Sequence, residues 1–298
     1  MGIEPIQINS ISLQDGTFQT SFYIWWRWHG PIDPCPTTDI LNSTASSSNY
    51  ITLYSYTNAA GIETPIRLGH GVKYQSAKVS VGIADPFSMG RYPLDSQNLS
   101  IRVENNTYDF DQVVYVADVA NLSKQPGLEV AGWNLTSTGL RQYVHQYATN
   151  FGTLDKTAGN SRYSQLRFDV EVKRPFSHFL MKLFLPLFAV LLAGISALFV
   201  KAEDFDVRLA MAGTGLLTLI FLQQGYAGDL PPTAPVVLMD EIYAFAYVTV
   251  GLTFLRVVYT TTRIHHGGLV AAFARTDRRI ATIMAIGFLV GSALVVGL

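Results

Sequence analysis

Four long apolar stretches in the second part of the chain constrain its fold more than any other feature. They cover residues 176–200, 207–227, 236–260 and 279–298. Each has roughly the 20 residues that a helix needs to cross a bilayer. Because a segment in hydrocarbon must satisfy its own backbone hydrogen bonds, all four are predicted to be helices. With 49% hydrophobic and 14% charged residues, the chain has the composition of a membrane protein, and residues 175–298 are predicted to form a transmembrane four-helix bundle.

The links between these stretches predict their orientation. The link between the third and fourth spans holds Arg263, Arg275, Arg278 and Arg279, so a short cytoplasmic loop is expected at 261–277, whereas residues 228–235 contain no cation. An even number of crossings then puts residues 1–174 and the C-terminus on the extracellular or periplasmic side of the cell (inner) membrane. Residues 1–4 lack the start of a signal sequence, so the chain is expected to begin at a mature or trimmed domain.

Residues 1–174 predict an antiparallel, immunoglobulin-like β-sandwich. Residues 7–13 and 17–28 alternate between apolar and polar side chains on either side of Asp15-Gly16, which is the pattern of a β-hairpin. Further short runs predict strands at 51–56, 74–83, 98–104, 112–118, 128–135, 141–150 and 163–173. Because Cys35 is the only cysteine, no internal disulfide can form and packing must hold this domain together.

The second apolar stretch carries one unusual face. Seven side chains follow each other on it at steps of three or four residues: Glu203, Asp206, Ala210, Thr214, Leu217, Phe221 and Gln224. Thr214 and Gln224 cost free energy in hydrocarbon unless they face protein or water. The stripe therefore predicts a helix that lines a passage. The alternative is that its small and hydroxyl residues only pack against other helices.

A short motif in the outer domain resembles a known family. Residues 91–97 are Arg-Tyr-Pro-Leu-Asp-Ser-Gln, similar to the aromatic-Pro-aromatic-Asp-x-Gln signature of the Cys-loop receptors, the pentameric ligand-gated ion channels. Leu94 replaces the second aromatic residue of that signature. Asp85 and Leu99 stand where the paired cysteines of the animal receptors would lie, which resembles the prokaryotic branch.

The resemblance extends over nearly the whole chain. Arg174 stands directly before the first span, Pro186 lies within it, and Leu230-Pro231-Pro232-Thr233 is similar to the Leu-Pro-x-Thr link before the third span of the family. Pro232 or Ala234 is an added residue in that link. The resemblance implies a homopentamer in the lipid bilayer with a pore along its axis.

In such a pentamer the stripe becomes a set of pore rings, made by Asp206, Ala210, Thr214, Leu217, Phe221 and Gln224. Leu217 and Phe221 would form the gate, because two narrow apolar rings exclude water. Rings of Asp206 and Glu203 would repel anions, so the permeant ions are predicted to be cations. Arg208, one position off the stripe, is expected to turn outward between helices or to snorkel; if it faced the axis, the predicted selectivity would reverse.

The resemblance also implies a coupling interface between the outer and membrane domains. Its members are Asp15, Tyr92, Pro93, Asp95, Arg174 and Pro231. The guanidinium of Arg174 can pair in a bidentate way with the carboxylates of Asp15 and Asp95, and ligand binding would reach the pore through this contact. The alternative is a surface ion pair of no energetic weight.

A ligand site between subunits is the remaining implication of the resemblance. The principal face would consist of Tyr108, Phe110, Tyr147, Phe151 and Tyr163, and the complementary face of Tyr23 and Trp25. Aromatic rings suit ammonium ligands through cation–π attraction, although each ring taken alone is more often part of the core. The small ligand is unknown: protons, small amines and divalent cations such as calcium stay open. No cofactor is expected, and a metal site is not predicted.

Other function classes have little support in the sequence. The formal net charge of −1 gives no reason to expect a nucleic-acid partner. There is no nucleophile elbow and no phosphate-binding glycine loop before a lysine, so the chain is not expected to be an enzyme. The alternative to a channel is a membrane-anchored ligand-binding sensor that does not conduct. One span would suffice for such an anchor.

Overall fold

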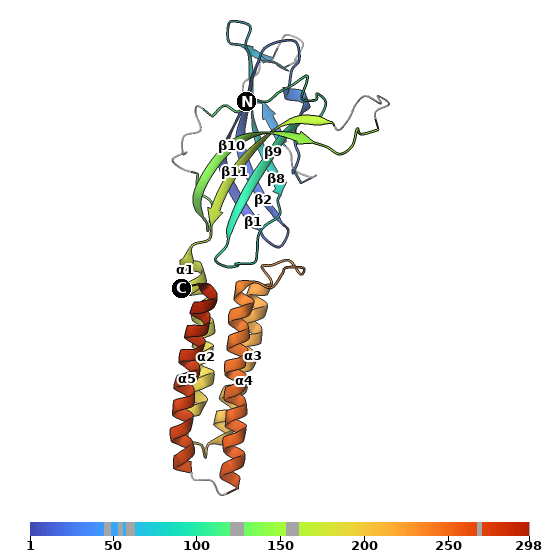
Figure 1. The fold of residues 1–298 in the computed structure, drawn as a ribbon. Coiled ribbons are helices and arrows are strands. Elements are labelled where there is room, and N and C mark those ends of the chain that lie inside the picture. Colours follow the sequence, from blue (N-terminus) through green and yellow to red (C-terminus); the bar gives the residue numbers. More distant parts are fainter. Residues whose placement is uncertain are drawn as a thin grey trace. The chain divides into compact units, whose positions relative to one another are not determined.

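The computed structural model describes residues 1–44, 49–52, 56–57, 63–119, 128–152, 161–266 and 270–297. Its internal contacts divide into two compact units (Figure 1). The first consists of Met1–Phe87 and Ser96–Lys173, and the second of Ser88–Asp95 and Arg174–Leu298. The boundary after Lys173 differs by one residue from the predicted boundary after residue 174. The segment Ser88–Asp95 differs from the prediction, because its contacts assign it to the helical unit although it lies within residues 1–174.

The first unit is a sandwich of antiparallel sheets. One sheet has the order β1 (Gly2–Ser12), β2 (Thr17–Trp28), β8 (Lys73–Ala84) and β4 (Asn49–Thr52), and β7 (Ile66–Arg67) also pairs with β8. The other has the order β10 (Asn134–Gln146), β11 (Arg162–Lys173), β9 (Ser96–Asn105) and β3 (Thr38–Ile40). A short pair, β5 (Tyr56–Thr57) and β6 (Glu63–Thr64), and the 3-10 turn η1 (Cys35–Thr37) complete the described elements. The predicted sandwich is confirmed.

The core of the sandwich follows from the alternation along its strands. Every second residue of β2 is buried: Phe18, Thr20, Phe22, Ile24 and Trp26. The matching residues of β11 are Leu166, Phe168, Val170 and Val172. Fully burying one such apolar side chain stabilises a fold by roughly 1.5–3 kcal/mol. At the predicted β1–β2 turn Gly16 has a φ of 64°, a conformation that glycine adopts without strain.

Two predicted strands are wrong in whole or in part. Residues 112–118 belong to no strand, because their backbone is satisfied in another way: Tyr115 N–H donates to Ser164 Oγ and Asp118 N–H donates to the carbonyl of Met1. The strand predicted at 128–135 starts only at Asn134, and before it Val130 makes isolated bridges. In the predicted strand 51–56, residues 53–55 lie outside the described residues.

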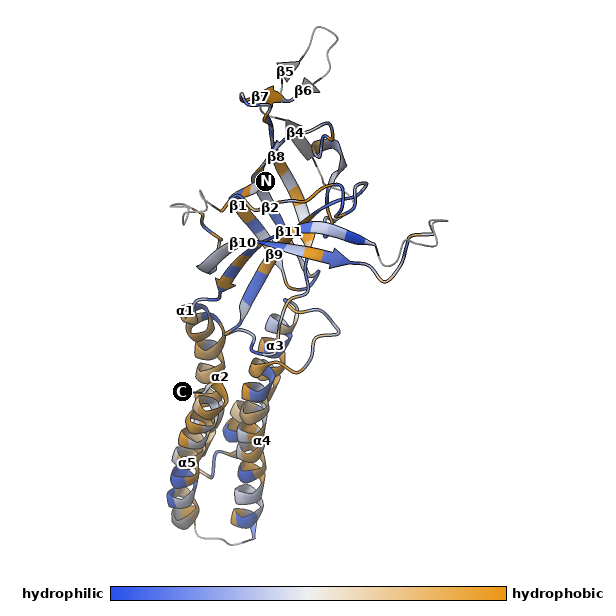
Figure 2. Cartoon of the chain, turned by 45° about the horizontal axis from the view of Figure 1, so that its top comes forward, coloured by the Kyte–Doolittle hydropathy of each residue, from blue (hydrophilic) through white to orange (hydrophobic). Residues whose placement is uncertain are grey.

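The second unit contains four helical spans among its described residues. The first span is built from α1 (Phe176–His178), the π-helical segment η2 (Phe179–Phe184), α2 (Leu185–Ser196) and the 3-10 turn η3 (Ala197–Phe199). The others are α3 (Phe205–Ala227), α4 (Leu238–His265) and α5 (Val270–Val296). All four are long and apolar enough to cross a membrane, and Figure 2 shows them as largely hydrophobic. The chain is a multi-pass membrane protein.

The first span changes its winding just before Pro186. A proline has no N–H to donate to the preceding turn and its ring crowds the carbonyl there. The turn before it is wider, and Leu185 N–H donates to the carbonyl of Leu180, five residues earlier. The π-helical segment η2 therefore accommodates the missing N–H and the ring of Pro186.

The link between the third and fourth spans is shorter than predicted. The sequence predicts helices at 236–260 and 279–298 with a loop at 261–277. In the structure α4 continues to His265 and α5 already starts at Val270. The polar residues in this region do not break the helices. Hydroxyls such as that of Thr261 donate to a carbonyl one turn earlier, and Asp277 is paired with arginines.

Candidate pore helix and ligand site

Helix α3 exposes the predicted stripe and buries the opposite face. All seven side chains of the stripe are exposed within the single chain. Six of them lie on α3, namely Asp206, Ala210, Thr214, Leu217, Phe221 and Gln224, whereas Glu203 lies in the turn before the helix. The gate residues Leu217 and Phe221 are 54% and 67% exposed. The buried residues of the helix are Arg208, Ala212, Gly215, Leu219 and Tyr226. The stripe is therefore not a packing face inside this bundle. This excludes the alternative that its small and hydroxyl residues pack against the other helices of the same chain.

Small residues explain how closely α3 and α2 approach on the buried face. A Cβ added to Gly215 would lie 3.4 Å from the Cα of Gly194. Because neither residue has a side chain, the two backbones can pack at this point, as small residues allow in membrane bundles. This contact holds one side of α3 against α2, so the stripe on its other side stays free of the bundle.

Arg208 lies inside the bundle and is completely buried. It lies between helices, as expected, but it does not snorkel. Its Nη2 is 2.6 Å from Oδ2 of Asp277 on α5, and its Nε donates to the carbonyl of Ala197 at 3.0 Å. The other carboxylate oxygen of Asp277 accepts from Nε of Arg256 on α4 at 2.8 Å. The carboxylate explains why a cation can stay buried here.

Arg174 forms a buried ion pair with the loop Ser88–Asp95. Its Nε is 2.9 Å from Oδ1 of Asp95, and the two side chains are only 11% and 2% exposed. The guanidinium also lies 5.1 Å from the centre of the Tyr92 ring. This burial contradicts the alternative of an exposed surface pair for Arg174 and Asp95.

The same loop contacts two of the helices. Leu238 and Met239, at the start of α4, donate their N–H groups to the carbonyls of Gly90 and Tyr92 at 3.0 and 3.2 Å. The first N–H groups of a helix have no partner within the helix, so the loop satisfies donors that would otherwise be unpaired. The Tyr92 ring stacks on Tyr226 of α3 with 6.3 Å between centres, and burial raises the pKa of Tyr92 to about 12.

The end of α3 is tied to the start of α4 by a tyrosine that the sequence did not single out. The Tyr226 hydroxyl donates a hydrogen bond to Asp240 Oδ1. Asp240 Oδ2 accepts from the N–H of Val237 at 3.0 Å and so caps α4. Tyr226 is thus a contact between the pore helix and both the loop Ser88–Asp95 and α4.

The remaining predicted coupling residues take different places. Pro93 follows Tyr92 through a cis peptide bond, within the loop that contacts the helices. Pro231 lies in the α3–α4 link, where its carbonyl accepts from the N–H of Ala234. Asp15 belongs to the first unit, where its carboxylate accepts from the Ser12 hydroxyl at 2.8 Å. Its pairing with Arg174 stays a prediction.

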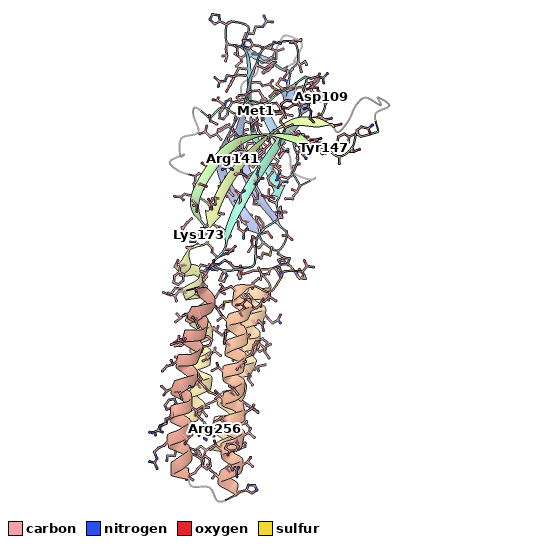
Figure 3. The ribbon with its side chains drawn as sticks, viewed as in Figure 1. Met1, Asp109, Arg141, Tyr147, Lys173 and Arg256 are labelled. Atoms are coloured by element: carbon pink, nitrogen blue, oxygen red, sulfur yellow. The ribbon has the colours of Figure 1, made fainter. Side chains whose placement is uncertain are left out.

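Three of the predicted ligand-site aromatics form a cluster at the end of the β10–β11 hairpin, where Figure 3 labels Tyr147. The ring of Tyr147 lies 5.0 Å from that of Phe151 and 5.7 Å from that of Tyr163. Phe151 is 58% exposed. Residues 153–160 lie outside the described residues.

A buried carboxylate that sequence reasoning missed lies next to this cluster. Glu104 on β9 is 3% exposed and accepts from the Tyr147 hydroxyl at 2.9 Å and from Gln165 Nε2 at 3.3 Å. His145 Nδ1 is 2.8 Å from the same carboxylate, and its ring lies 4.1 Å from that of Tyr147. Burial, and next the hydrogen bond to Glu104, raise the pKa of Tyr147. The aromatic cluster therefore has a negative charge behind it.

The other predicted ligand residues lie outside this cluster. The guanidinium of Arg162, the residue before Tyr163, lies 5.7 Å from the centre of the Phe110 ring. The N–H of Tyr108 donates to Asn105 Oδ1. Trp25 on β2 donates from Nε1 to Asp118 at 3.0 Å, and Tyr23 on the same strand is 38% exposed. These two residues belong to the other sheet, and their place opposite a neighbouring subunit stays a prediction.

Fold and site together define a class: a multi-pass membrane protein with a β-sandwich unit and one spanning helix that exposes a polar stripe. No family model matches the chain. It is 24% identical over 165 residues to a glutamate-gated chloride channel of Drosophila melanogaster, a match covering 55% of this chain and 34% of that protein. It is 26% identical over 181 residues to the gamma-aminobutyric acid receptor subunit pi of Bos taurus, covering 60% and 39%. With the same subunit of Rattus norvegicus it is 24% identical over 262 residues, covering 81% and 55%.

The chain spans about a third to just over half the length of these relatives. They are subunits of Cys-loop ligand-gated channels, and this chain is homologous to them. The resemblance drawn from residues 91–97 is thereby confirmed. None of the three is named as an enzyme. The prokaryotic origin stays a prediction.

Proposed function

We propose that this chain is the subunit of a homopentameric, cation-selective, ligand-gated ion channel. The observation that carries the proposal is the stripe on α3, where Asp206, Thr214 and Gln224 are exposed while the other helices cover the opposite face. Polar side chains on a spanning helix need water or protein beside them. Five such helices around an axis would provide water, with Leu217 and Phe221 as a gate that closes by dewetting.

The membrane and orientation belong to the same proposal. Four arginines lie near the α4–α5 link, at Arg263, Arg275, Arg278 and Arg279, and we place this end on the cytoplasmic side of the cell membrane. The β-sandwich unit and the C-terminus are then outside. In this orientation Glu203 and Asp206 lie near the cytoplasmic mouth of the pore, and we call this the inner end of α3.

Cation selectivity is supported by which charges the stripe exposes. Glu203 and Asp206 are exposed at the inner end, whereas the guanidinium of Arg208 is buried against Asp277. Five copies of each acid would concentrate cations and repel anions. The competing candidate is an anion channel, which is favoured by a relative named as a glutamate-gated chloride channel. A sensor that does not conduct is the third outcome of the test.

Removing the acids of the stripe is expected to weaken selectivity. Purified chain would be checked for a pentamer by its mass in detergent and recorded in planar bilayers across a sodium chloride gradient. The variant E203Q/D206N should lower the sodium-to-chloride permeability ratio by about tenfold, since five copies of two charges are lost at one mouth. The matched control is D204N, an exposed acid of the same region that lies off the stripe. A wild-type reversal potential at the chloride equilibrium value would sink cation selectivity, and absence of unitary currents would favour the sensor.

We propose that the activating ligand is a small amine bound at the aromatic cluster. The rings of Tyr147, Phe151 and Tyr163 offer cation–π attraction of on the order of 0.5–2 kcal/mol each, and the buried carboxylate of Glu104 adds a negative charge behind them. The relatives' names refer to glutamate and gamma-aminobutyric acid, both of which carry an ammonium group. We therefore expect the ligand to present such a group to the rings.

Neutralising Glu104 is expected to reduce the apparent affinity for the activating amine. A panel of small amines would be applied to the channel, and E104Q should shift the half-activating concentration of any active amine upward by about tenfold, because one charge next to the bound ammonium is lost. The matched variant Y147F removes the hydrogen bond to Glu104 but keeps the ring, so its shift should be smaller. An unchanged half-activating concentration in E104Q would place the site elsewhere.

A further inference from the structure

The cluster of Arg208, Asp277 and Arg256 ties all four spans together at one end of the bundle. Arg208 comes from α3, Asp277 from α5 and Arg256 from α4, while the carbonyl of Ala197 at the end of the first span accepts from Arg208. Figure 3 shows Arg256 near the end of the bundle where α4 and α5 are linked. Of the stripe acids, Asp206 lies in the first turn of α3 at this same end, and Glu203 lies in the turn just before the helix.

The charges of the cluster do not cancel. Two guanidinium groups share one carboxylate, and Nη1 of Arg208 has no hydrogen-bond partner among the described residues. The side chains of Arg208 and Asp277 are 0% and 1% exposed. Apolar residues of similar volume often stabilise a fold at least as well as a buried ion pair does, so this pair points to a role in positioning or function.

The position of Arg208 fixes which way the stripe can face. Arg208 follows Asp206 by two residues, which places it about 200° around an α-helix from Asp206. A guanidinium held against α5 therefore requires Asp206 to point away from the bundle. Asp206 is indeed exposed, in the same turn in which Arg208 is fully buried.

We infer that Asp277 is a positioning residue for ion selectivity: it holds and partly neutralises Arg208 on the protein side of α3, so that Asp206 and Glu203 face the pore. The inference rests on the proposed function and adds to it a selectivity determinant on a helix that does not line the pore. Without the carboxylate, the inner turn of α3 loses its rotational anchor. In the pentamer, the positive charges of the five Arg208 guanidinium groups would then no longer be compensated by Asp277, and they would lie next to the acidic rings.

The test compares reversal potentials in a set of charge variants. D277N should lower the sodium-to-chloride permeability ratio by about fivefold or more, since a positive charge is left uncompensated in every subunit next to the acidic rings. R208Q/D277N removes that charge and leaves two amides that can hydrogen-bond across the same contact, so it should restore the ratio to within about twofold of wild type. R208E/D277R exchanges the two charges and keeps the pair, so it should restore the ratio as well.

The outcomes separate the inference from a merely structural role and from the proposed function. Pentameric D277N with the wild-type reversal potential overturns the inference, as does a ratio that falls equally in R208Q/D277N. If D277N forms no pentamer, R208E/D277R decides: assembly with the wild-type reversal potential supports the pairing, and failure to assemble overturns it. Wild-type protein without unitary currents instead contradicts the proposed function.

Discussion

Replacing Leu217 with serine is expected to produce a channel that conducts without ligand. Leu217 is 54% exposed on the stripe of α3, and five copies would make one of the two apolar rings that exclude water from the closed pore. A hydroxyl in this ring binds water, so the wetted state gains in each subunit. A gain of only about 0.3 kcal/mol per subunit, summed over five, changes the ratio of open to closed channels by about tenfold.

The measurement is the open probability of single channels in the absence of amine, for wild type and L217S. The matched control is L255S, because Leu255 on α4 is also exposed, at 63%, but lies on a helix outside the proposed pore wall. We expect ligand-free openings in L217S and the wild-type behaviour in L255S. If the two variants behave alike, Leu217 faces lipid as Leu255 does, and the assignment of the stripe to the pore is wrong.

The face of α3 could be predicted from the sequence because helical periodicity alone decides which side chains share a side. The six stripe residues on α3 need no knowledge of the other helices to be grouped, whereas Glu203 precedes the helix, so helical periodicity does not apply to it. Their exposure in the folded chain then separates the stripe from the buried face that carries Gly215 and Leu219. Periodicity does not show whether water, lipid or another subunit faces the stripe. For this reason the pentamer remains a proposal.

The partner of Arg208 could not be predicted, because Asp277 lies 69 positions further along the chain. The same pairing explains why the sequence predicts a loop at 261–277 where the structure has the start of α5. Asp277 among several arginines looks like a solvated link, yet this carboxylate is 1% exposed and paired on both oxygens. Charged residues in a helix are informative only together with the residues that they contact.

Glu104 was missed for a related reason. A carboxylate in a strand is expected on the solvent side, since burying an unpaired charge is costly. Here hydrogen bonds with Tyr147, Gln165 and His145 compensate that cost. His145 and Tyr147 come from β10 and the residue directly after it, and β10 is separated from β9 by β11. The aromatic residues alone were predictable as a group, whereas the charge behind them depends on the register of β9, β10 and β11.

Replacing Arg174 with glutamine is expected to separate ligand binding from opening. The loop Ser88–Asp95 connects β8 to β9, and Arg174 directly follows β11, so movements of three strand ends reach this ion pair through the chain itself. The pair is buried, and its loop donates carbonyls to the start of α4 and stacks Tyr92 on α3. Removing one partner leaves the carboxylate of Asp95 without its guanidinium, at a cost of about 3–5 kcal/mol.

The expected result for R174Q is amine binding close to that of wild type with macroscopic current reduced by about a hundredfold or more, since about 3 kcal/mol of the coupling would be lost. Binding would be measured by calorimetry on the purified pentamer and current in bilayers of the same preparation. The control is K173Q, because Lys173 is the exposed neighbour of Arg174 at the end of β11 and lies outside the ion pair. The double variant D95N/R174Q replaces both charges with amides and should recover part of the current, because no unpaired charge then remains buried. Equal losses of binding and current in R174Q would mean that the pair stabilises the fold rather than transmits the signal, and unchanged current would remove it from the coupling path.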